Sequence, residues 1–223
     1  MNTDKKIIKG LIFDMDGLIF DSERIVQRAW NIVGEKLGYG QEFGNHIYNT
    51  IGFNVNRREV YFRENVDKEF PMERFTIESR NAFHEIIKNE GVLIKRGAVE
   101  LMDYAKEQGY KMAVATSSRR EHAERLLKDN GIYQYFDAKV YGDMVKYSKP
   151  NPEIYLKACE GIEEEPKLCI ALEDSPAGIL SARAAGLTSV MIPDLVKVKD
   201  DELVSDYIFD DLFCVKELLQ DWK

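Results

Sequence analysis

Acidic and hydroxyl side chains follow short apolar segments at three places in this sequence, and a cluster with a lysine lies between the last two of these places, just before an expected helix. Carboxylate oxygens are ligands that Mg²⁺ prefers, an aspartate can attack phosphorus, and a lysine can offset the charge of a phosphoryl group. If the fold brings such clusters together, they can support metal-assisted phosphoryl transfer. The clusters are Asp14-Met15-Asp16-Gly17, Thr116-Ser117-Ser118, Ser148-Lys149-Pro150-Asn151-Pro152 and Glu173-Asp174-Ser175.

The apolar pattern predicts a scaffold that would bring these clusters to one place. From residue 97 onward, strand-like and helix-like segments alternate, which indicates an α/β fold with a doubly wound parallel sheet and helices on both faces. In such sheets the chemistry collects at the carboxyl ends of the strands. The expected strands are 7–13, 111–116, 139–141, 168–172, 189–192 and 207–209, and the expected helices are 99–108, 119–130, 152–160, 177–185 and 212–221.

The segment from residue 21 to about residue 91 differs from the rest of the chain. Apolar residues recur there at helical spacing, for example Ile25, Ala29, Ile32 and Val33, and no strand pattern is evident. We therefore expect a helical insertion between the first strand and the remainder of the sheet.

Composition excludes several functional classes. The chain has 223 residues and a formal charge of −8, without a stretch dense in lysine and arginine, which disfavours nucleic-acid binding. Its three cysteines lack metal-ligand spacing, as expected for reduced thiols in a cytosolic protein. Because no apolar run is long enough for a signal peptide or a membrane span, we expect a cytoplasmic protein without membrane contact.

Each cluster, taken alone, also has a purely structural interpretation. Paired aspartates after a strand often form turns, and residues 116–118 can cap the helix expected near Arg119. Lys149 can be a solvated loop lysine, and Glu173 with Asp174 can supply charge at a helix N-terminus. The occurrence of all clusters at successive strand ends favours the functional interpretation.

The segments DMDGLIFDS, ATSS, SKPNPEIY and LEDSPAG, in this order, resemble the four motifs of the haloacid dehalogenase-like hydrolases. The resemblance is closest to the branch that holds the β-phosphoglucomutase-like phosphatases, and it covers essentially the whole chain. It implies a Rossmann-like catalytic core formed by residues 1–17 and 95–223, and a helical cap domain formed by residues 18–94. It also implies a Mg²⁺ cofactor and a small phosphorylated metabolite as the substrate.

The resemblance further implies a role for each acidic residue. Asp14 would be the nucleophile, and Asp16 would protonate the leaving oxygen and later activate water. The metal would be bound by Asp14, by Asp174 and by the backbone carbonyl of Asp16. Glu173 would hold these ligands from a second layer of contacts.

The other motif residues would bind the phosphoryl group or the substrate. Thr116 would donate a hydrogen bond to a phosphoryl oxygen, and Lys149 would offset the charge on this group and on Asp14. The remaining residues assigned to substrate binding are Met15, Gly17, Ser117, Ser118 and Arg119.

Two departures from the mutase members concern the cap. These members carry a histidine twelve residues after the nucleophile, where this chain has Val26, and an arginine soon after a cap glycine, which the segment 52–56 lacks. Arg57 and Arg58 follow this segment closely. A phosphatase is therefore favoured over a β-phosphoglucomutase-type mutase, and a non-catalytic phosphoryl-binding module is the third hypothesis. A monomer is expected, because one chain supplies the complete site.

Overall fold

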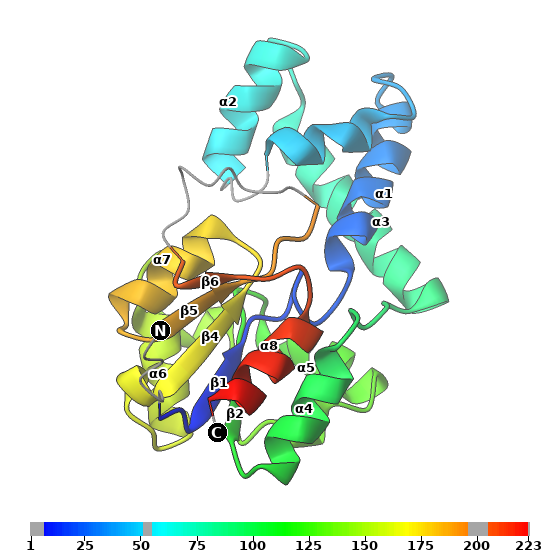
Figure 1. Cartoon of the computed structure of the whole chain (residues 1–223). Coiled ribbons are helices and arrows are strands. Elements are labelled where there is room, and N and C mark those ends of the chain that lie inside the picture. The colour runs from blue at the N-terminus through cyan, green and yellow to red at the C-terminus, as the bar shows by residue number, and fades with distance from the viewer. Residues whose placement is uncertain (1–6, 51–54, 196–204, 223) are drawn as a thin grey trace. The chain divides into compact units, whose positions relative to one another are not determined.

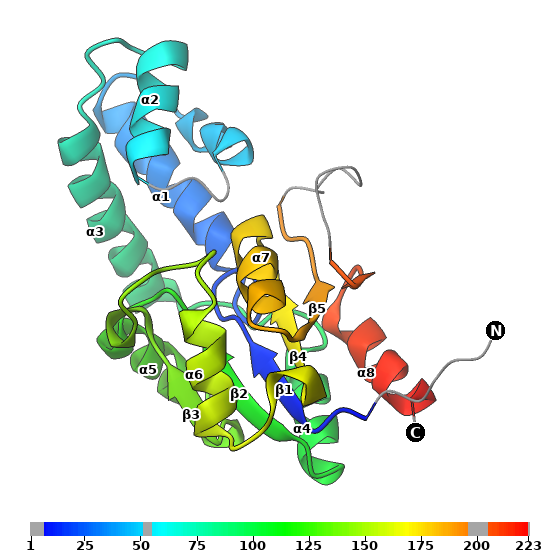
Figure 2. The ribbon, with the colours of Figure 1, turned by 90° about the vertical axis from the view of Figure 1, so that its left-hand side faces the viewer.

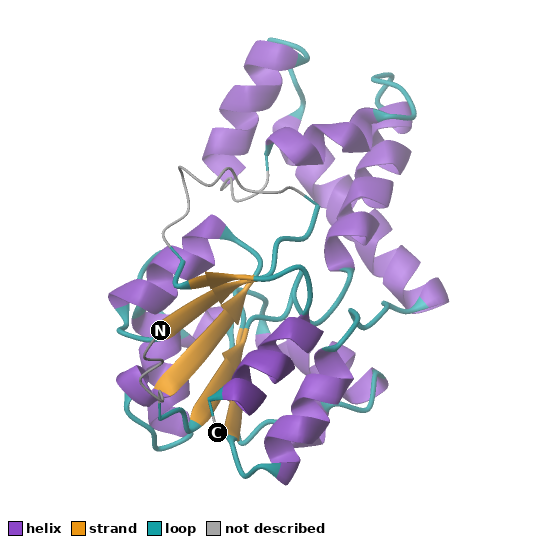
Figure 3. Ribbon diagram, in the orientation of Figure 1, coloured by secondary structure: helices purple, strands orange, loops and turns teal. Residues whose placement is uncertain are grey.

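The computed structural model describes residues 7–50, 55–195 and 205–222 and divides the chain into two compact units. The sheet unit comprises Met1–Phe20 and Ile94–Lys223, and the helical unit comprises Asp21–Leu93. Figure 3 shows the strands confined to the sheet unit. The division falls a few residues from the boundaries expected after residues 17 and 94, and the role of the helical unit as a cap stays a prediction.

The sheet unit is built on six parallel strands in the order β3-β2-β1-β4-β5-β6. The central strand β1 pairs with β2 on one side and with β4 on the other, and all four of its residues are buried. This strand order is that of a doubly wound sheet, which confirms the predicted fold class. The strands are β1 (Gly10–Phe13), β2 (Lys111–Ala115), β3 (Ala138–Val140), β4 (Cys169–Glu173), β5 (Thr188–Met191) and β6 (Tyr207–Ile208).

Helices cover both faces of this sheet. Helix α6 packs on β1, β2 and β3, and α7 packs on β4 and β5, whereas α4 and α8 pack together on the opposite face (Figures 1 and 2). The helices are α4 (Ala98–Glu107), α5 (Arg120–Asp129), α6 (Glu153–Gly161), α7 (Pro176–Ala184) and α8 (Leu212–Asp221), with short 3₁₀ turns at Tyr133–Tyr135, Gly142–Met144 and Pro166–Leu168.

All six strands differ from the expected ones by one to three residues at one end or at both. Two of these differences have a clear physical reason. Strand β1 begins at Gly10, not at residue 7, because both neighbouring ladders begin opposite this glycine. Strand β4 extends one residue beyond the prediction, because Glu173 pairs with Met191 and its carbonyl accepts a hydrogen bond from the N–H of Ile192 at 2.7 Å. Glu173 is therefore a strand residue, and the β-ladder holds its backbone.

The described part of the helical unit contains helices and no strand. It consists of α1 (Ser22–Lys36), a 3₁₀ helix η1 (Phe43–Asn49), α2 (Val55–Asn65) and α3 (Met72–Glu90). Helix α1 packs along α3 and against η1. Among the residues that the structure describes in either unit, no helix is long and apolar enough to cross a bilayer.

An aromatic cluster forms the core of the helical unit. The ring of Phe62 on α2 is fully buried and lies 4.6 Å from that of Phe70 and 5.3 Å from those of Phe43 and Phe75, measured between centroids. The contact with Phe75 is edge-to-face and the other two are tilted, and such ring contacts add to the free energy gained by burying the rings. Phe62 therefore joins the helices of this unit.

We predict that Phe62→Ala destabilises the helical unit by about 3–5 kcal/mol, because it removes a buried ring and leaves a cavity. Urea denaturation followed by circular dichroism measures this change. Val60→Ala on the same helix is the matched control, since Val60 is 54% exposed and should change stability little. Equal effects of the two substitutions would contradict the assigned core.

Candidate active site

The predicted clusters meet at the carboxyl ends of the three central strands. Asp14 directly follows β1, Thr116 follows β2, and Glu173 ends β4, with Asp174 behind it. Because β2, β1 and β4 are neighbours in a parallel sheet, these residues lie at the same edge. The N–H of Asp14 donates to the carbonyl of Leu172 at 3.0 Å, so the β-ladder still holds the backbone at this point.

Lys149 links the clusters through its ammonium group. Its Nζ donates to Asp14 Oδ1, to Glu173 Oε1 at 2.6 Å and to the carbonyl of Ala115 at 3.0 Å. The side chain of Lys149 is only 7% exposed, and that of Glu173 is fully buried. A buried ammonium needs such partners, since an unpaired charge is unstable away from water. Lys149 is therefore a buried bridge, and the interpretation as a solvated loop lysine is excluded.

The charges in this group perturb one another. Burial disfavours the charged form of Lys149, but Asp14 and Glu173 outweigh this effect and raise the pKa of Lys149. Burial raises the pKa of Asp14 to about 7, Lys149 opposes this rise, and the charges of Glu173 and Asp16 add to it. One ammonium shared by two carboxylates leaves a net negative charge, which favours a further cation nearby.

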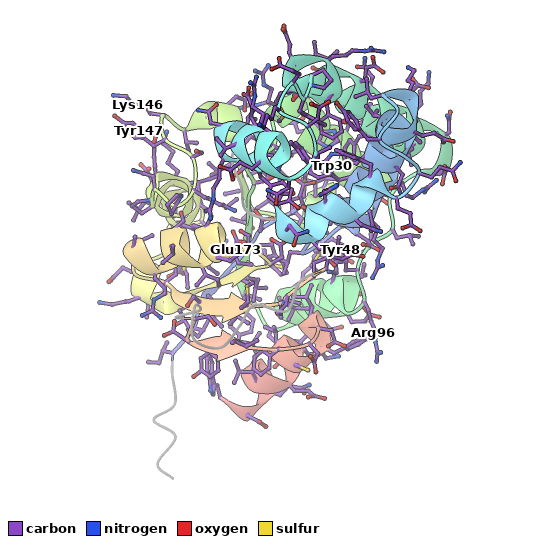
Figure 4. The ribbon with its side chains drawn as sticks, turned by 90° about the horizontal axis from the view of Figure 1, so that it is seen from above. Trp30, Tyr48, Arg96, Lys146, Tyr147 and Glu173 are labelled. Atoms are coloured by element: carbon purple, nitrogen blue, oxygen red, sulfur yellow. The ribbon has the colours of Figure 1, made fainter. Side chains whose placement is uncertain are left out.

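Both carboxylate oxygens of Glu173 are engaged by donors. Oε1 accepts from Lys149 and from the hydroxyl of Tyr155 at 2.7 Å. Oε2 accepts from the N–H groups of Asp174 and Ser175 at 3.2 Å and from the hydroxyl of Ser175 at 3.0 Å. Glu173 thus stabilises the start of α7 and also holds the Lys149 ammonium group. The structural interpretation of this residue, as a charge at a helix N-terminus, and its place in the predicted site are therefore compatible. In Figure 4 it lies inside the sheet unit, whereas Lys146 and Tyr147 project outward.

Two glycines allow the close approach of the acidic residues. Gly17 has a φ of +80°, and a Cβ at this position would collide with Asp174 Oδ2. A Cβ on Gly178, in the first turn of α7, would collide with the carboxyl group of Glu173. The N–H of Gly178 donates to Ser175 Oγ at 3.1 Å, which caps this helix.

The hydroxyl cluster after β2 faces Asp16. Ser118 Oγ donates to Asp16 Oδ2 at 2.7 Å, Thr116 Oγ1 lies 3.4 Å from the same oxygen, and the N–H of Ser118 donates to Thr116 Oγ1 at 3.0 Å. The alternative in which this cluster caps α5 is wrong, because the N-cap residue is Arg119, whose side chain makes no capping hydrogen bond. The N–H of Arg120 at the start of this helix donates to Asp143 Oδ1 at 3.3 Å. The hydroxyls are thus available to Asp16 and to a group bound beside it.

The acidic residues can hold a metal ion. One carboxylate oxygen from each of Asp14, Glu173 and Asp174 lies within 4.8 Å of the others. Such hard oxygen donors suit a divalent cation. Since both oxygens of Glu173 already accept hydrogen bonds, Asp14 and Asp174 are better placed as direct ligands, with Glu173 behind them.

Three predicted substrate-binding residues do not belong to the group of side chains around Lys149. Ser117 and Arg119 are exposed at the end of β2. Met15 is fully buried, and its carbonyl accepts from the N–H groups of Ile19 and Phe20. The side chain of Met15 therefore packs in the core, and only its backbone can serve a ligand.

The predicted cap features lie in the helical unit. Val26 is half-buried on α1, and the guanidinium of Arg58 lies 5.1 Å from the centroid of the Trp30 ring. Gly52, Phe53 and Asn54 lie outside the described residues. The substrate contacts expected of this unit stay a prediction.

Sequence reasoning assigned no role to Tyr155 or Ser175, which both contact Glu173. Each residue stands inside a recognised motif, since Tyr155 closes SKPNPEIY and Ser175 lies within LEDSPAG. Spacing alone gives no indication that a tyrosine on α6 reaches the end of β4.

Comparisons with known proteins agree with this arrangement. A family model described as haloacid dehalogenase-like hydrolase matches residues 11–192. The chain is 31% identical to a phosphorylated carbohydrates phosphatase of Thermotoga maritima, covering 82% of this chain and 84% of that protein. It is 30% identical to hexitol phosphatase B of Escherichia coli, covering 86% of each chain. The crystal structure of CbbY from Rhodobacter sphaeroides in complex with phosphate superposes with a TM-score of 0.71 at 26% identity, covering 92% of this chain and 95% of that one.

The raised pKa of Asp14 predicts a pH dependence of stability in the metal-free protein. The folded state retains the Asp14 proton up to about pH 7, whereas the unfolded chain releases it near the ordinary value of 3.8. The resulting stabilisation is complete below the unfolded value and is lost as the pH rises through 7. In chelator, the free energy of unfolding of wild type relative to Asp14→Asn should therefore fall between pH 5 and pH 8.

Urea denaturation at several pH values measures this difference. Asp129→Asn, at the exposed end of α5, is the control that should follow wild type at every pH. If the free energies of unfolding of wild type and Asp14→Asn changed with pH in the same way, the raised pKa of Asp14 would be contradicted.

Gly178→Ala tests the close approach between α7 and Glu173. Alanine favours a helix by about 1 kcal/mol, yet we expect a net loss of about 1–3 kcal/mol, because the new methyl displaces the Glu173 carboxyl group. Ala177→Gly in the same turn is the control, with a loss of at most about 1 kcal/mol. If Gly178→Ala stabilises the protein in thermal unfolding, the packing described here is wrong.

Proposed function

This chain belongs to the haloacid dehalogenase-like hydrolases, and we propose that it is a Mg²⁺-dependent phosphatase acting through an aspartyl-phosphate on Asp14. The proposed substrate is a small phosphomonoester, such as a sugar or nucleoside phosphate. The observation that carries the proposal is the convergence of the buried Asp14 with its lysine partner Lys149 and with Asp174.

In the first proposed step, a carboxylate oxygen of Asp14 attacks the phosphorus atom. A bond forms between this oxygen and phosphorus, and the bond from phosphorus to the ester oxygen breaks. Asp16 gives its proton to the departing oxygen, so that an alcohol leaves. Lys149 offsets the like charges of the carboxylate and the phosphoryl group, which would otherwise repel each other.

In the second proposed step, water hydrolyses the acyl phosphate. Asp16, now a carboxylate, accepts a proton from water while the water oxygen bonds to phosphorus. The bond between phosphorus and the Asp14 oxygen breaks, which releases phosphate and restores Asp14. The contact between Ser118 and Asp16 supports this role, because it fixes a side chain that must serve two different atoms.

Further residues would bind the phosphoryl group and the metal. Thr116 would donate to a phosphoryl oxygen, and the exposed Ser117 and Arg119 would face the substrate. Asp14, Asp174 and the carbonyl of Asp16 would hold Mg²⁺, with Glu173 bracing them. When bound, the ion would neutralise phosphoryl charge and orient the group for attack.

Sugar and polyol phosphates are the first substrates to examine, since the named relatives act on phosphorylated carbohydrates and hexitol phosphates. A mutase must hold a second phosphate, and Val26 stands where the mutase members carry histidine. We therefore retain hydrolysis as the proposal, in a cytoplasmic monomer.

Phosphate release across a panel of phosphomonoesters, with Mg²⁺ and with chelator, tests this function. We predict Mg²⁺-dependent release from one or a few sugar or nucleotide phosphates, and a loss of at least about 1,000-fold in Asp14→Asn, because the nucleophile is removed. Asp129→Asn is the matched control and should retain wild-type activity.

The same panel separates the alternatives. Activity retained in Asp14→Asn would overturn the assigned nucleophile. Formation of glucose 6-phosphate from β-glucose 1-phosphate in a coupled assay would support the mutase instead. No turnover of any ester by a folded protein would favour the non-catalytic phosphoryl-binding module.

A further inference from the structure

We propose that Tyr155 is a positioning residue that keeps the ammonium group of Lys149 directed at Asp14. The inference rests on the proposed function, because the position of Lys149 matters for catalysis only if Asp14 is the nucleophile. Tyr155 lies on α6, outside the strand ends that carry the acidic residues.

Tyr155 contacts this group in two ways. Its hydroxyl donates to Glu173 Oε1 at 2.7 Å, and the same oxygen accepts from Lys149 Nζ at 2.6 Å. The Nζ atom also lies 5.1 Å from the centroid of the tyrosine ring, within the range of a cation–π contact. The ring therefore lies against the ammonium while the hydroxyl holds one of its two carboxylate partners.

Packing alone does not explain the hydroxyl group. Tyr155 is fully buried. The other residues that α6 buries are Ile154, Ala158 and Cys159, and Ile162 is buried just past the end of this helix. A phenylalanine would fill the same space without a polar atom to satisfy. Burial and the charge of Glu173 raise the pKa of Tyr155, so the hydroxyl keeps its proton and acts as a donor.

The hydroxyl sets how Lys149 is shared between its two carboxylates. With the tyrosine bond in place, part of the charge on Glu173 Oε1 is already stabilised, and the ammonium can remain on Asp14. Without it, Glu173 attracts Lys149 more strongly, and the charge on Asp14 and the phosphoryl group is less well offset. Because this defect acts in the transition state, it should lower kcat more than it changes KM.

Tyr155→Phe tests the proposal in the full-length protein. We expect kcat for the best substrate of the wild type to fall about tenfold or more, with KM changed less than about twofold, the loss typical of one charge-assisted hydrogen bond. Tyr110→Phe is the matched control, since Tyr110 precedes β2 at the opposite edge of the sheet. It should leave kcat unchanged.

A second measurement does not depend on turnover. In protein labelled with ¹⁵N-lysine, the Lys149 side-chain resonance, assigned with Lys149→Arg, should shift in Tyr155→Phe and stay in place in Tyr110→Phe. If the wild type hydrolyses no ester, the proposed function fails, and this resonance still tests the link from Tyr155 to Lys149. Unchanged kcat and an unchanged resonance, with or without a lower Tm, would overturn the positioning role.

Discussion

The burial of one ammonium between two carboxylates is the constraint on which the rest of the site depends. Lys149 is buried in the sheet unit, where an unpaired charge is unstable, and Asp14 and Glu173 both pair with it. The balance is incomplete, because two negative charges face one positive charge. Burial raises the pKa of Asp14, the charge of Glu173 adds to this rise, and the surplus negative charge favours a cation nearby. The burial and the surplus negative charge that disfavour an ionised Asp14 in the metal-free protein make the group suited to a divalent cation.

The doubly wound sheet supplies the rigidity that this arrangement needs. Asp14 and Glu173 leave neighbouring strands, and backbone bonds of the ladder continue to the positions where their side chains meet. A loop lysine can then reach both carboxylates only because α6 and α7 pack on the same face of the sheet and fix its approach. Gly178 belongs to this packing, since any larger residue there would press on Glu173. Stability and chemistry thus rest on the same contacts.

Much of this could be predicted from the sequence, for identifiable reasons. The strands are short apolar runs that end in polar clusters, and parallel neighbours necessarily present these clusters at one edge. The clusters at Asp14 and Glu173 were predicted for this reason, the cluster at Lys149 was predicted just before a helix, and the structure brings all three together. The orientation of Ser118 toward Asp16, and not toward the end of α5, was not decided by sequence, because a hydroxyl before a helix fits both arrangements. The contact from Tyr155 was missed because it joins a helix to a strand end that lies eighteen residues further along the chain.

The hydrogen bonds that Glu173 accepts distinguish it from the neighbouring acid Asp174. Two adjacent carboxylates could otherwise both bind a metal ion or the lysine. A carboxylate that already accepts five hydrogen bonds has little capacity left for a metal, and its burial at the end of β4 prevents it from turning toward one. Asp174, one residue later, has left the strand and is partly exposed. Adjacent acidic residues therefore differ in position because the strand ends between them: Glu173 holds Lys149 from inside the sheet, and Asp174 lies partly exposed at its edge. In the proposed function, the position of the strand end, more than the acidity of either residue, determines which carboxylate would serve the metal and which serves the lysine.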